Sequence, residues 1–250
     1  MQQVLRPPPL DFDSALFIDF DGTLVEIAPR PDLVRVPSDL PPLLDRVTGE
    51  RGGALALITG RRIADIDRLM YPWHGAVAGV HGAERRHPDG SEPPPDAANR
   101  GAFEALARIR PRLRAFADRC PGMLLEDKGR TLALHYRGAP ERAAEIRALA
   151  DALLRAHGEH LRLIDGKMLV ELQPRSDGKH RAIAAFMEEP PFRGRRAIFL
   201  GDDTTDEDGF AEINRRGGLS IRVGAPDAPT AARCNLPSVA AVWEWLSAER

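Results

Sequence analysis

Short apolar runs recur along this chain, and each one stops near a polar residue or a glycine. Apolar residues at helical spacing, such as Ile63, Ile66 and Met70, lie between several of these runs. Short buried strands that alternate with helices predict an α/β fold with a parallel sheet. The runs with the length of a buried strand are 15–18, 54–58, 76–80, 197–200 and 219–223.

The polar residues at the ends of these runs are expected to meet. Open α/β sheets of the Rossmann-like kind bind ligands at the carboxyl ends of their strands. Asp19, Thr59 and Asp202 each follow one of the predicted strands directly or within two residues. The pattern therefore predicts that these three side chains converge on one edge of the sheet.

The middle of the chain has the pattern of antiparallel hairpins. A tight turn at Gly129-Arg130 separates two strand-like segments, and Asp165-Gly166 is a strong hairpin signal between two more. We interpret Asp165 as a turn residue rather than a catalytic one. The four strand-like segments are 123–128, 131–137, 161–164 and 168–172.

Two helical stretches accompany these hairpins. Pro111 is expected to kink or divide the first helix, and the second is predicted to begin at Pro140 and end at Gly158. The segment 98–172 therefore reads as a separate α+β module inserted into the sheet domain. The sheet domain is predicted to consist of residues 1–97 and 173–250.

Composition excludes several other classes of protein. The 250 residues carry a formal net charge of −2, so nothing favours binding to a nucleic acid. Only two cysteines occur, which argues against a disulfide framework or a cysteine metal site. The first residues lack the apolar core of a signal peptide, and no apolar run approaches the roughly 18 residues that span a membrane. We expect a cytoplasmic protein without membrane contact.

The segment Asp19-Phe20-Asp21-Gly22 places two carboxylates at the end of the first predicted strand. One carboxylate suits nucleophilic attack on phosphorus, and the other suits proton transfer to the departing alkoxide. Gly22 permits a turn in which backbone N–H groups face phosphate oxygens. The alternative is an ordinary Asp-Gly surface turn. Asp11 and Asp13 have the same spacing without the glycine, and we interpret them as unrelated.

Two further segments carry groups that suit a phosphate ester. Thr59, beside the flexible Gly60, can bind a phosphate oxygen near the start of a helix, although capping that helix is an alternative role. Lys179 can neutralise Asp19 and hold a transferring phosphoryl group, whereas most lysines are solvated surface charges.

Five acids lie within residues 202–208, after the fourth apolar run. Like charges so close together repel one another, so a bound cation is expected. Glu207 and Asp208 are better explained by the first turn of a helix, where acids complement the helix dipole.

Magnesium is the cation that this set of oxygen ligands favours, because Mg²⁺ needs only one or two carboxylates beside water and phosphate. We expect direct ligation by Asp19, Asp202 and the backbone carbonyl of Asp21. Asp203 and Asp206 are expected to orient waters bound to the metal.

The four motifs, in this order, resemble those of the haloacid dehalogenase (HAD) superfamily, whose phosphatases carry DxDGT after the first strand. The resemblance covers nearly the whole chain and implies a HAD-like core with a large inserted cap. It implies Asp19 as the nucleophile and Asp21 as the general acid and base. Thr59 and Lys179 are the implied phosphoryl-binding catalytic residues.

Other segments resemble one branch, the trehalose-6-phosphate phosphatase family: Val80-His81-Gly82-Ala83-Glu84, Leu134-His135-Tyr136-Arg137 and the string GDDTTDE. The branch implies a Mg²⁺-dependent phosphatase of trehalose biosynthesis that is functionally coupled to a trehalose-6-phosphate synthase. His135 and Tyr136 are interpreted as packing residues. The substrate-binding residues that the resemblance implies are Gly22, Thr23, Gly60, Arg61, His81, Glu126, Lys128 and Glu171.

Two alternatives stay open. The substrate could be another sugar phosphate, such as sucrose 6-phosphate or mannosyl-phosphoglycerate, because cap residues rather than core motifs decide it. The chain could also be a catalytically silent sensor of sugar phosphates. Such a sensor is expected to have lost Asp19 or Asp21, and both are present.

Overall fold

The computed structural model describes residues 5–93, 99–166, 168–225 and 229–248. The chain forms two compact units, one of Met1–Pro93 with Gly178–Arg250 and one of Pro94–Asp177. We call them the core unit and the cap unit. The expected boundary between residues 97 and 98 lies outside the described residues. Within the described ranges, no helix combines the length and apolar character needed to cross a membrane.

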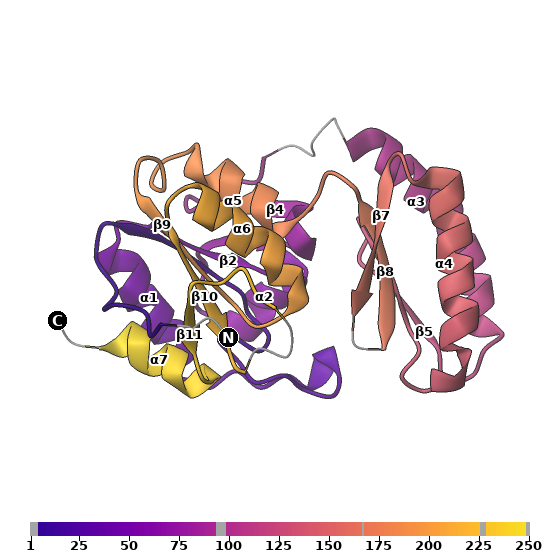
Figure 1. The fold of residues 1–250 in the computed structure, drawn as a ribbon, viewed down its shortest axis with the longest axis horizontal. Helices are drawn as coiled ribbons and strands as arrows, with labels where there is room; N and C mark the ends of the chain where they lie inside the picture. Colours follow the sequence, from indigo (N-terminus) through magenta and orange to yellow (C-terminus); the bar gives the residue numbers. More distant parts are fainter. Residues whose placement is uncertain (1–4, 94–98, 167, 226–228, 249–250) are drawn as a thin grey trace. The chain divides into compact units, whose positions relative to one another are not determined.

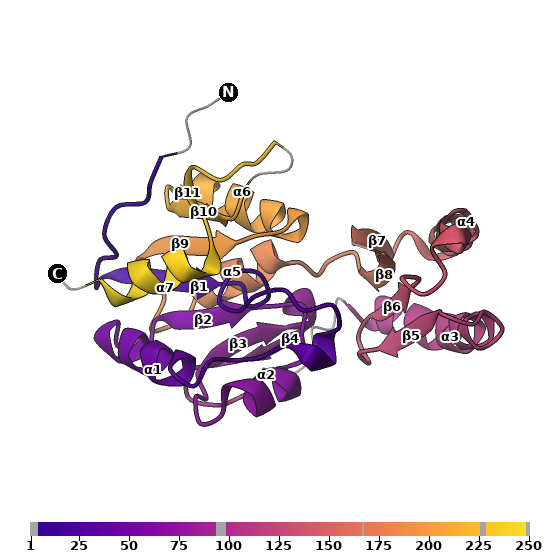
Figure 2. The same cartoon turned by 90° about the horizontal axis from the view of Figure 1, so that it is seen from below.

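The core unit contains a seven-stranded sheet in the order β11-β10-β9-β1-β2-β3-β4 (Figures 1 and 2). All neighbouring strands pair in parallel except β3 and β4, which are antiparallel. The predicted α/β fold with a parallel sheet is confirmed. The strands are β1 (Ser14–Ile18), β2 (Leu55–Ile58), β3 (Ala76–Gly79), β4 (Glu84–Arg86), β9 (Arg196–Gly201), β10 (Leu219–Val223) and β11 (Cys234–Leu236).

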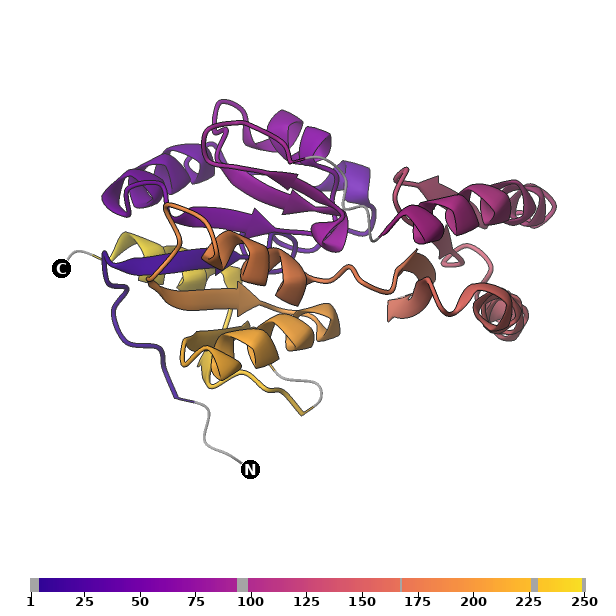
Figure 3. The same ribbon diagram turned by 90° about the horizontal axis from the view of Figure 1, so that it is seen from above.

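Helices cover both faces of this sheet (Figures 2 and 3). Leu16 and Ile18 of β1 belong to an apolar cluster with α1, α2 and α7, whereas Ala15 and Phe17 belong to a second cluster with α5 and α6. Successive residues of a strand point to opposite faces, so a strand buried on both sides must be apolar throughout. This requirement explains the uninterrupted apolar runs. The helices are α1 (Leu40–Glu50), α2 (Ile63–Met70), α5 (Lys179–Met187), α6 (Glu207–Arg215) and α7 (Val239–Ser247).

The sequence pattern missed β4 and β11, the two edge strands of the sheet. Each is three residues long, and β4 reads Glu-Arg-Arg. Short or charged edges protect a sheet from pairing with other chains, so edge strands lack the apolar run of central ones. Val80 was assigned to the third strand, but it has φ +49° and begins the turn after β3.

The cap unit is a four-stranded antiparallel sheet in the order β5-β6-β8-β7, with two helices packed on one face (Figure 1). Leu132, Leu134, Val170 and Leu172 form its apolar core with residues of both helices. The elements are α3 (Arg100–Asp118), β5 (Leu124–Asp127), β6 (Leu132–His135), α4 (Ala143–His157), β7 (Leu161–Gly166) and β8 (Leu169–Pro174).

Two local predictions for the cap can be compared with the structure. Of the two outcomes expected at Pro111, a kinked helix or a divided one, division is excluded, because helix α3 runs through Pro111. The second hairpin exists, but the expected turn at Asp165-Gly166 is wrong, because these residues pair with Val170 and Leu169 inside the ladder. The observed register sets Leu163 opposite Leu172 and pairs six residues of each strand, which outweighs the preference of Asp-Gly for a turn.

Candidate active site

Two acids of the core unit follow adjacent parallel strands. Asp19 follows β1 and Asp202 follows β9, and Ile18 lies directly opposite Leu200 in the register of these strands. The Asp19 N–H donates to the Leu200 carbonyl at 2.9 Å. The chain continues from β1 to β2 on one side of the sheet and reaches β9 on the other, so this is the topological switch point, where open α/β sheets bind ligands.

Asp206 joins these two acids from the short helical turn η5 (Thr204–Asp206). One oxygen from each of Asp19, Asp202 and Asp206 lies within 4.8 Å of the others, and the three carboxylates could hold a metal ion. Asp19 is 5% exposed and Asp206 is fully buried. The expected convergence of Asp19 and Asp202 is therefore present, with Asp206 as the third acid.

Lys179, at the first position of α5, lies between two of the acids. Its Nζ donates to Asp19 Oδ1 and to Asp206 Oδ1, both at 2.6 Å. The lysine is 4% exposed. A single ammonium thus contacts two of the three clustered carboxylates in a buried place, where charges interact more strongly than in water.

The pKa values of these groups reflect the excess of carboxylates over ammonium groups in the cluster. Burial raises the pKa of Asp19 well above its usual range; Lys179 opposes this shift, and Asp206 and Asp202 add to it. Burial, followed by the nearby Asp206, raises the pKa of Asp202 to about 7. Burial disfavours the charged form of Lys179, but Asp19 and Asp206 together outweigh it and raise its pKa.

This donor set fits a divalent cation. Hard cations such as Mg²⁺ take carboxylate oxygens, and a cation beside Asp19 and Asp202 would offset the burial and the mutual repulsion that raise their pKa values. Asp206 accepts from Lys179 and, through Oδ2, from the Asp203 N–H at 3.0 Å. Asp203 caps η5 by accepting from the Thr204 N–H, and it is not one of the three clustered acids.

Gly22 is required by the close approach of Asp202. A Cβ on Gly22 would lie 2.2 Å from one Asp202 carboxylate oxygen, and Gly22 has φ +84°. Its N–H donates to the Val25 carbonyl at 2.7 Å. Thr23 is fully buried, and its hydroxyl has no hydrogen-bond partner among the described residues.

Asp21 forms a bidentate ion pair with Arg61. Arg61 Nε donates to Oδ2 at 2.6 Å and Nη2 donates to Oδ1 at 2.7 Å. A third guanidinium nitrogen, Nη1, donates to the Pro31 carbonyl at 3.1 Å. Arg61 was expected to bind substrate, but here its planar fork matches a carboxylate of the protein itself.

Thr59 lies beside this pair in the loop after β2. It is 1% exposed, and its hydroxyl accepts from the Arg61 N–H at 3.1 Å. Helix α2 begins four residues after Thr59, at Ile63, without a side-chain cap, so the alternative role of Thr59 as the cap of that helix is not observed.

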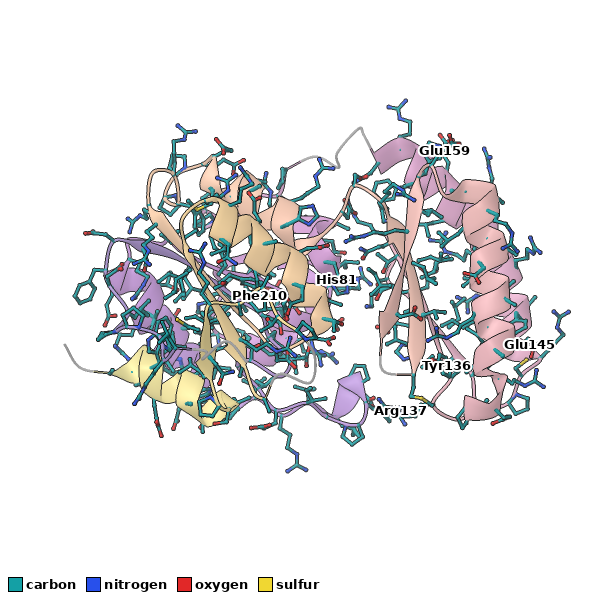
Figure 4. The ribbon with its side chains drawn as sticks, viewed as in Figure 1. His81, Tyr136, Arg137, Glu145, Glu159 and Phe210 are labelled. Atoms are coloured by element: carbon teal, nitrogen blue, oxygen red, sulfur yellow. The ribbon has the colours of Figure 1, made fainter. Side chains whose placement is uncertain are left out.

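His81 (labelled in Figure 4) belongs to a strained turn after β3. Val80, His81 and Gly82 all have positive φ, which is unusual for a β-branched residue such as Val80. Two backbone bonds hold the turn: Val80 N–H to the Arg61 carbonyl at 2.8 Å and His81 N–H to the Thr59 carbonyl at 2.9 Å. A Cβ on Gly60 would lie 2.7 Å from the His81 ring, so the ring packs directly on Gly60.

The remaining predicted site residues lie in the cap unit. Lys128 Nζ is 3.4 Å from Glu171 Oε1, and Glu171 is 3% exposed. Glu126 is 2.8 Å from His135 Nε2. His135 was expected to pack in a core, as Tyr136 does at 5% exposure, but its ring pairs with Glu126.

Sequence reasoning missed three of these contacts: the Arg61–Asp21 pair, the Lys179–Asp206 bond and the partners of the cap acids. No spacing rule relates these residues, since 40 positions separate Arg61 from Asp21 and 27 separate Lys179 from Asp206. Glu207, by contrast, lies outside the cluster as expected. Its carboxylate accepts from Thr230 Oγ1 and from the Ala231 N–H, both at 2.7 Å.

Comparison with known proteins gives a consistent result. The profile of the trehalose-phosphatase family matches residues 17–240. A probable trehalose-phosphate phosphatase of Sinorhizobium fredii is 46% identical over 93% of this chain and 86% of its own length. The trehalose-6-phosphate phosphatase of Escherichia coli is 43% identical over 98% of this chain and 90% of its own length.

Solved structures resemble the fold as well. A trehalose-6-phosphate phosphatase related protein has a TM-score of 0.75 at 27% identity, covering 92% of this chain and 94% of its own. The C-terminal domain of a trehalose-6-phosphate phosphatase of Candida albicans has a TM-score of 0.81 at 21% identity, covering 98% of both chains, and at this identity the likeness concerns the fold alone.

Proposed function

The chain belongs to the trehalose-phosphatase family, and on that premise we propose how it removes phosphate from trehalose 6-phosphate: through a phosphoaspartate on Asp19. The enzyme is a phosphoric monoester hydrolase of trehalose biosynthesis. The observation that carries the proposal is the buried cluster in which Lys179 contacts Asp19 and Asp206 at 2.6 Å beside Asp202. Such a cluster contributes little to stability, because the cost of burying charges offsets what their pairing gains, and buried charges of this kind are typical of functional sites.

In the first step, a carboxylate oxygen of Asp19 attacks phosphorus while the bond from phosphorus to the sugar oxygen breaks. Asp21 gives its proton to that oxygen, so trehalose leaves as a neutral alcohol. In the second step, a water attacks the phosphorus of the aspartyl-phosphate and gives a proton to Asp21. Phosphate departs, and the Asp19 carboxylate is restored.

The Arg61–Asp21 pair adds a condition to this sequence of steps. The proton donor must be free of its bidentate bond to Arg61 before it can protonate the leaving group. A phosphate dianion offers the guanidinium a competing partner of the same geometry. Arg61 therefore binds the phosphate and, by moving to it, releases Asp21.

The positive charge that stabilises the phosphoryl oxygens comes from Lys179 and from a cation. Lys179 holds a transferring phosphoryl oxygen while it stays bonded to Asp19. Thr59, through its hydroxyl, and Thr23, whose buried hydroxyl has no partner among the described residues, are suited to further phosphate oxygens. Mg²⁺ held by Asp19, Asp202 and the Asp21 carbonyl would supply charge stabilisation to the phosphoryl oxygens.

The cap supplies recognition of the sugar in this proposal. Glu126, Lys128 and Glu171 offer two carboxylates and an ammonium to the hydroxyls of a disaccharide, which both donate and accept hydrogen bonds. The functional coupling to a trehalose-6-phosphate synthase and the cytoplasmic location stay predictions.

Phosphate release from a panel of phosphate esters tests the proposal. The panel contains trehalose 6-phosphate, sucrose 6-phosphate, mannosyl-phosphoglycerate and an aryl phosphate, each with Mg²⁺ and with a chelator. We expect the highest kcat/KM for trehalose 6-phosphate and loss of all activities with the chelator. A higher kcat/KM for another sugar phosphate would contradict the assignment of trehalose 6-phosphate as the substrate. Activity that survives chelation would contradict the role of the cation.

A further inference from the structure

The cap sheet has two faces of different chemistry. Helices α3 and α4 pack on the face that carries Leu132 and Leu134 of β6 (Figure 1). Successive side chains of a strand alternate between faces, so Thr131, Ala133 and His135 point to the opposite one. This second face is polar, and we call it the polar face of the cap.

Ala133 occupies the middle of the polar face. In the strand registers it lies directly opposite Glu126 of β5 on one side and Glu171 of β8 on the other. Directly opposite residues have Cβ atoms about 4.5–5.5 Å apart, so the three side chains are neighbours. Ala133 is 1% exposed. Its methyl group leaves space for the two carboxylates on either side.

Thr131 and His135, which lie on either side of Ala133 in the chain, each form a hydrogen bond with one of the two carboxylates. Thr131 Oγ1 donates to Glu171 Oε1 at 2.6 Å, and Thr131 is fully buried. His135 Nε2 lies 2.8 Å from Glu126 Oε2. The Lys128 ammonium is farther from Glu171, at 3.4 and 3.5 Å from its oxygens.

The acids of the polar face are thus held by a side chain of β6 and by that of the residue just before β6, through bonds shorter than the one from the lysine. The hydrogen bond from His135 also lowers the pKa of the Glu126 carboxyl, which keeps it an acceptor. A carboxylate held in one orientation loses less freedom when it binds a hydroxyl than a carboxylate that is free to rotate.

We propose that Thr131 and His135 are positioning residues for substrate specificity, which orient Glu171 and Glu126 toward the sugar, and that Ala133 lets these two carboxylates converge. The inference rests on the proposed function, in which Glu126, Lys128 and Glu171 bind the sugar. It adds three residues that touch no substrate themselves and act through the two acids.

Thr131 offers the sharpest test, because two substitutions separate its hydroxyl from its shape. Thr131→Val keeps the branched side chain and removes the donor, whereas Thr131→Ser keeps the donor. We expect Thr131→Val to raise KM for trehalose 6-phosphate by about tenfold, since hydrogen bonds to charged groups are among the stronger ones. Thr131→Ser is expected to stay within about twofold of the wild type. Hydrolysis of an aryl phosphate and the thermal midpoint serve as controls.

His135 and Ala133 extend the test to the other acid and to the space between the two. His135→Leu removes the bond to Glu126 and is expected to raise KM for the sugar phosphate, while His135→Gln retains a donor and recovers most of the loss. Ala133→Val adds bulk between the carboxylates and is expected to raise the same KM without affecting kcat for the aryl phosphate.

The outcomes separate this inference from the function on which it rests. A Thr131→Val enzyme with the wild-type KM, beside a Glu171→Ala enzyme with a raised one, would overturn the positioning role and leave the proposed function intact. Equal losses on both substrates, or no recovery in Thr131→Ser, would assign these residues to stability alone. A wild-type enzyme that prefers a different sugar phosphate would overturn the assignment of trehalose 6-phosphate as the substrate, and the inference with it.

Discussion

The acid cluster of the core and the polar face of the cap each combine carboxylates with a lysine, but they balance charge differently. In the core, Lys179 contacts two acids at 2.6 Å and a third acid lies beside them, which leaves an excess of negative charge. In the cap, Lys128 stays 3.4 Å from Glu171, and Thr131 and His135 bond the two acids at 2.6 and 2.8 Å.

The titration of the acids follows the same contrast. Burial raises the pKa values of Asp19 and Asp202, whereas a hydrogen bond from His135 lowers that of Glu126. A place with excess negative charge suits a cation and a phosphoryl group. A place where carboxylates are already stabilised suits neutral hydroxyl donors. The proposed function accordingly assigns chemistry to the acids of the core unit and recognition to those of the cap unit.

Replacement of the nucleophile Asp19 should abolish the activity that depends on the core cluster. We expect Asp19→Asn to lower kcat/KM by more than about a thousandfold on sugar and aryl phosphates alike, because the attacking oxygen and a metal ligand are both lost. The measurement is phosphate release by the folded variant. The exposed Asp13 offers a matched control, since Asp13→Asn makes the same chemical change outside the cluster. More than a few per cent of residual activity in Asp19→Asn would contradict the covalent step.

Asp21→Asn should separate proton transfer to the leaving group from the attack on phosphorus within the core cluster. General acid catalysis contributes about 10²–10⁴-fold, so we expect a loss in that range on trehalose 6-phosphate. An aryl phosphate has a better leaving group that needs less protonation, so its loss should be smaller. The ratio of the two kcat/KM losses is the measured quantity. Equal losses would show that Asp21 is not the acid of the first step.

Removal of one cap charge should affect recognition alone. Lys128→Ala or Glu171→Ala is expected to lower kcat/KM for trehalose 6-phosphate by about tenfold, the cost of one charged hydrogen bond. Hydrolysis of an aryl phosphate should hardly change. Arg147→Ala is the control, because it removes an exposed cap ion pair with Asp165 that is worth about 0–1 kcal/mol. Losses that are the same for both substrates would remove the support for sugar recognition by these residues.

The smallest expected effect concerns stability: the free energy of unfolding of the enzyme without its cation should change with pH. The pKa of Asp202, about 7, is raised above that of an unfolded aspartate, so the folded chain holds this proton between roughly pH 4 and pH 7 and loses stability as pH rises through that window. We expect the thermal midpoint with a chelator to fall as pH rises toward neutrality.

Mg²⁺ should restore stability most at the upper end of this window, where it no longer competes with a proton. Calorimetric or fluorescence melting at pH 5.5 and pH 8, with and without Mg²⁺, measures both effects. In Asp202→Asn both the slope with pH and the gain from Mg²⁺ should shrink. A gain that is the same at the two pH values would argue against Asp202 as the titrating ligand.

The sequence alone was sufficient for the parallel α/β core, the inserted cap and the trehalose-phosphatase family. Strands buried on both faces must be apolar throughout, so β1, β2, β9 and β10 appear in the sequence as apolar runs. The acids and the hydroxyl at their ends could be predicted as well, because parallel strands bring their carboxyl ends to one edge of the sheet. The edge strands β4 and β11 escaped this reasoning, since an edge needs no such run.

Only the tertiary structure decided which partner each of these side chains faces. The Arg61 guanidinium could have met a phosphate or a carboxylate, and the fold sets it against Asp21. The sequence does not single out Asp206 from the four other acids of residues 202–208, whereas the turn of η5 places its carboxylate against Lys179. His135 was interpreted as a packing residue, but the register of β5 and β6 brings it to Glu126. Periodicity determines which face of an element is buried, whereas a contact between distant residues depends on register and side-chain direction, which the amino-acid pattern does not contain.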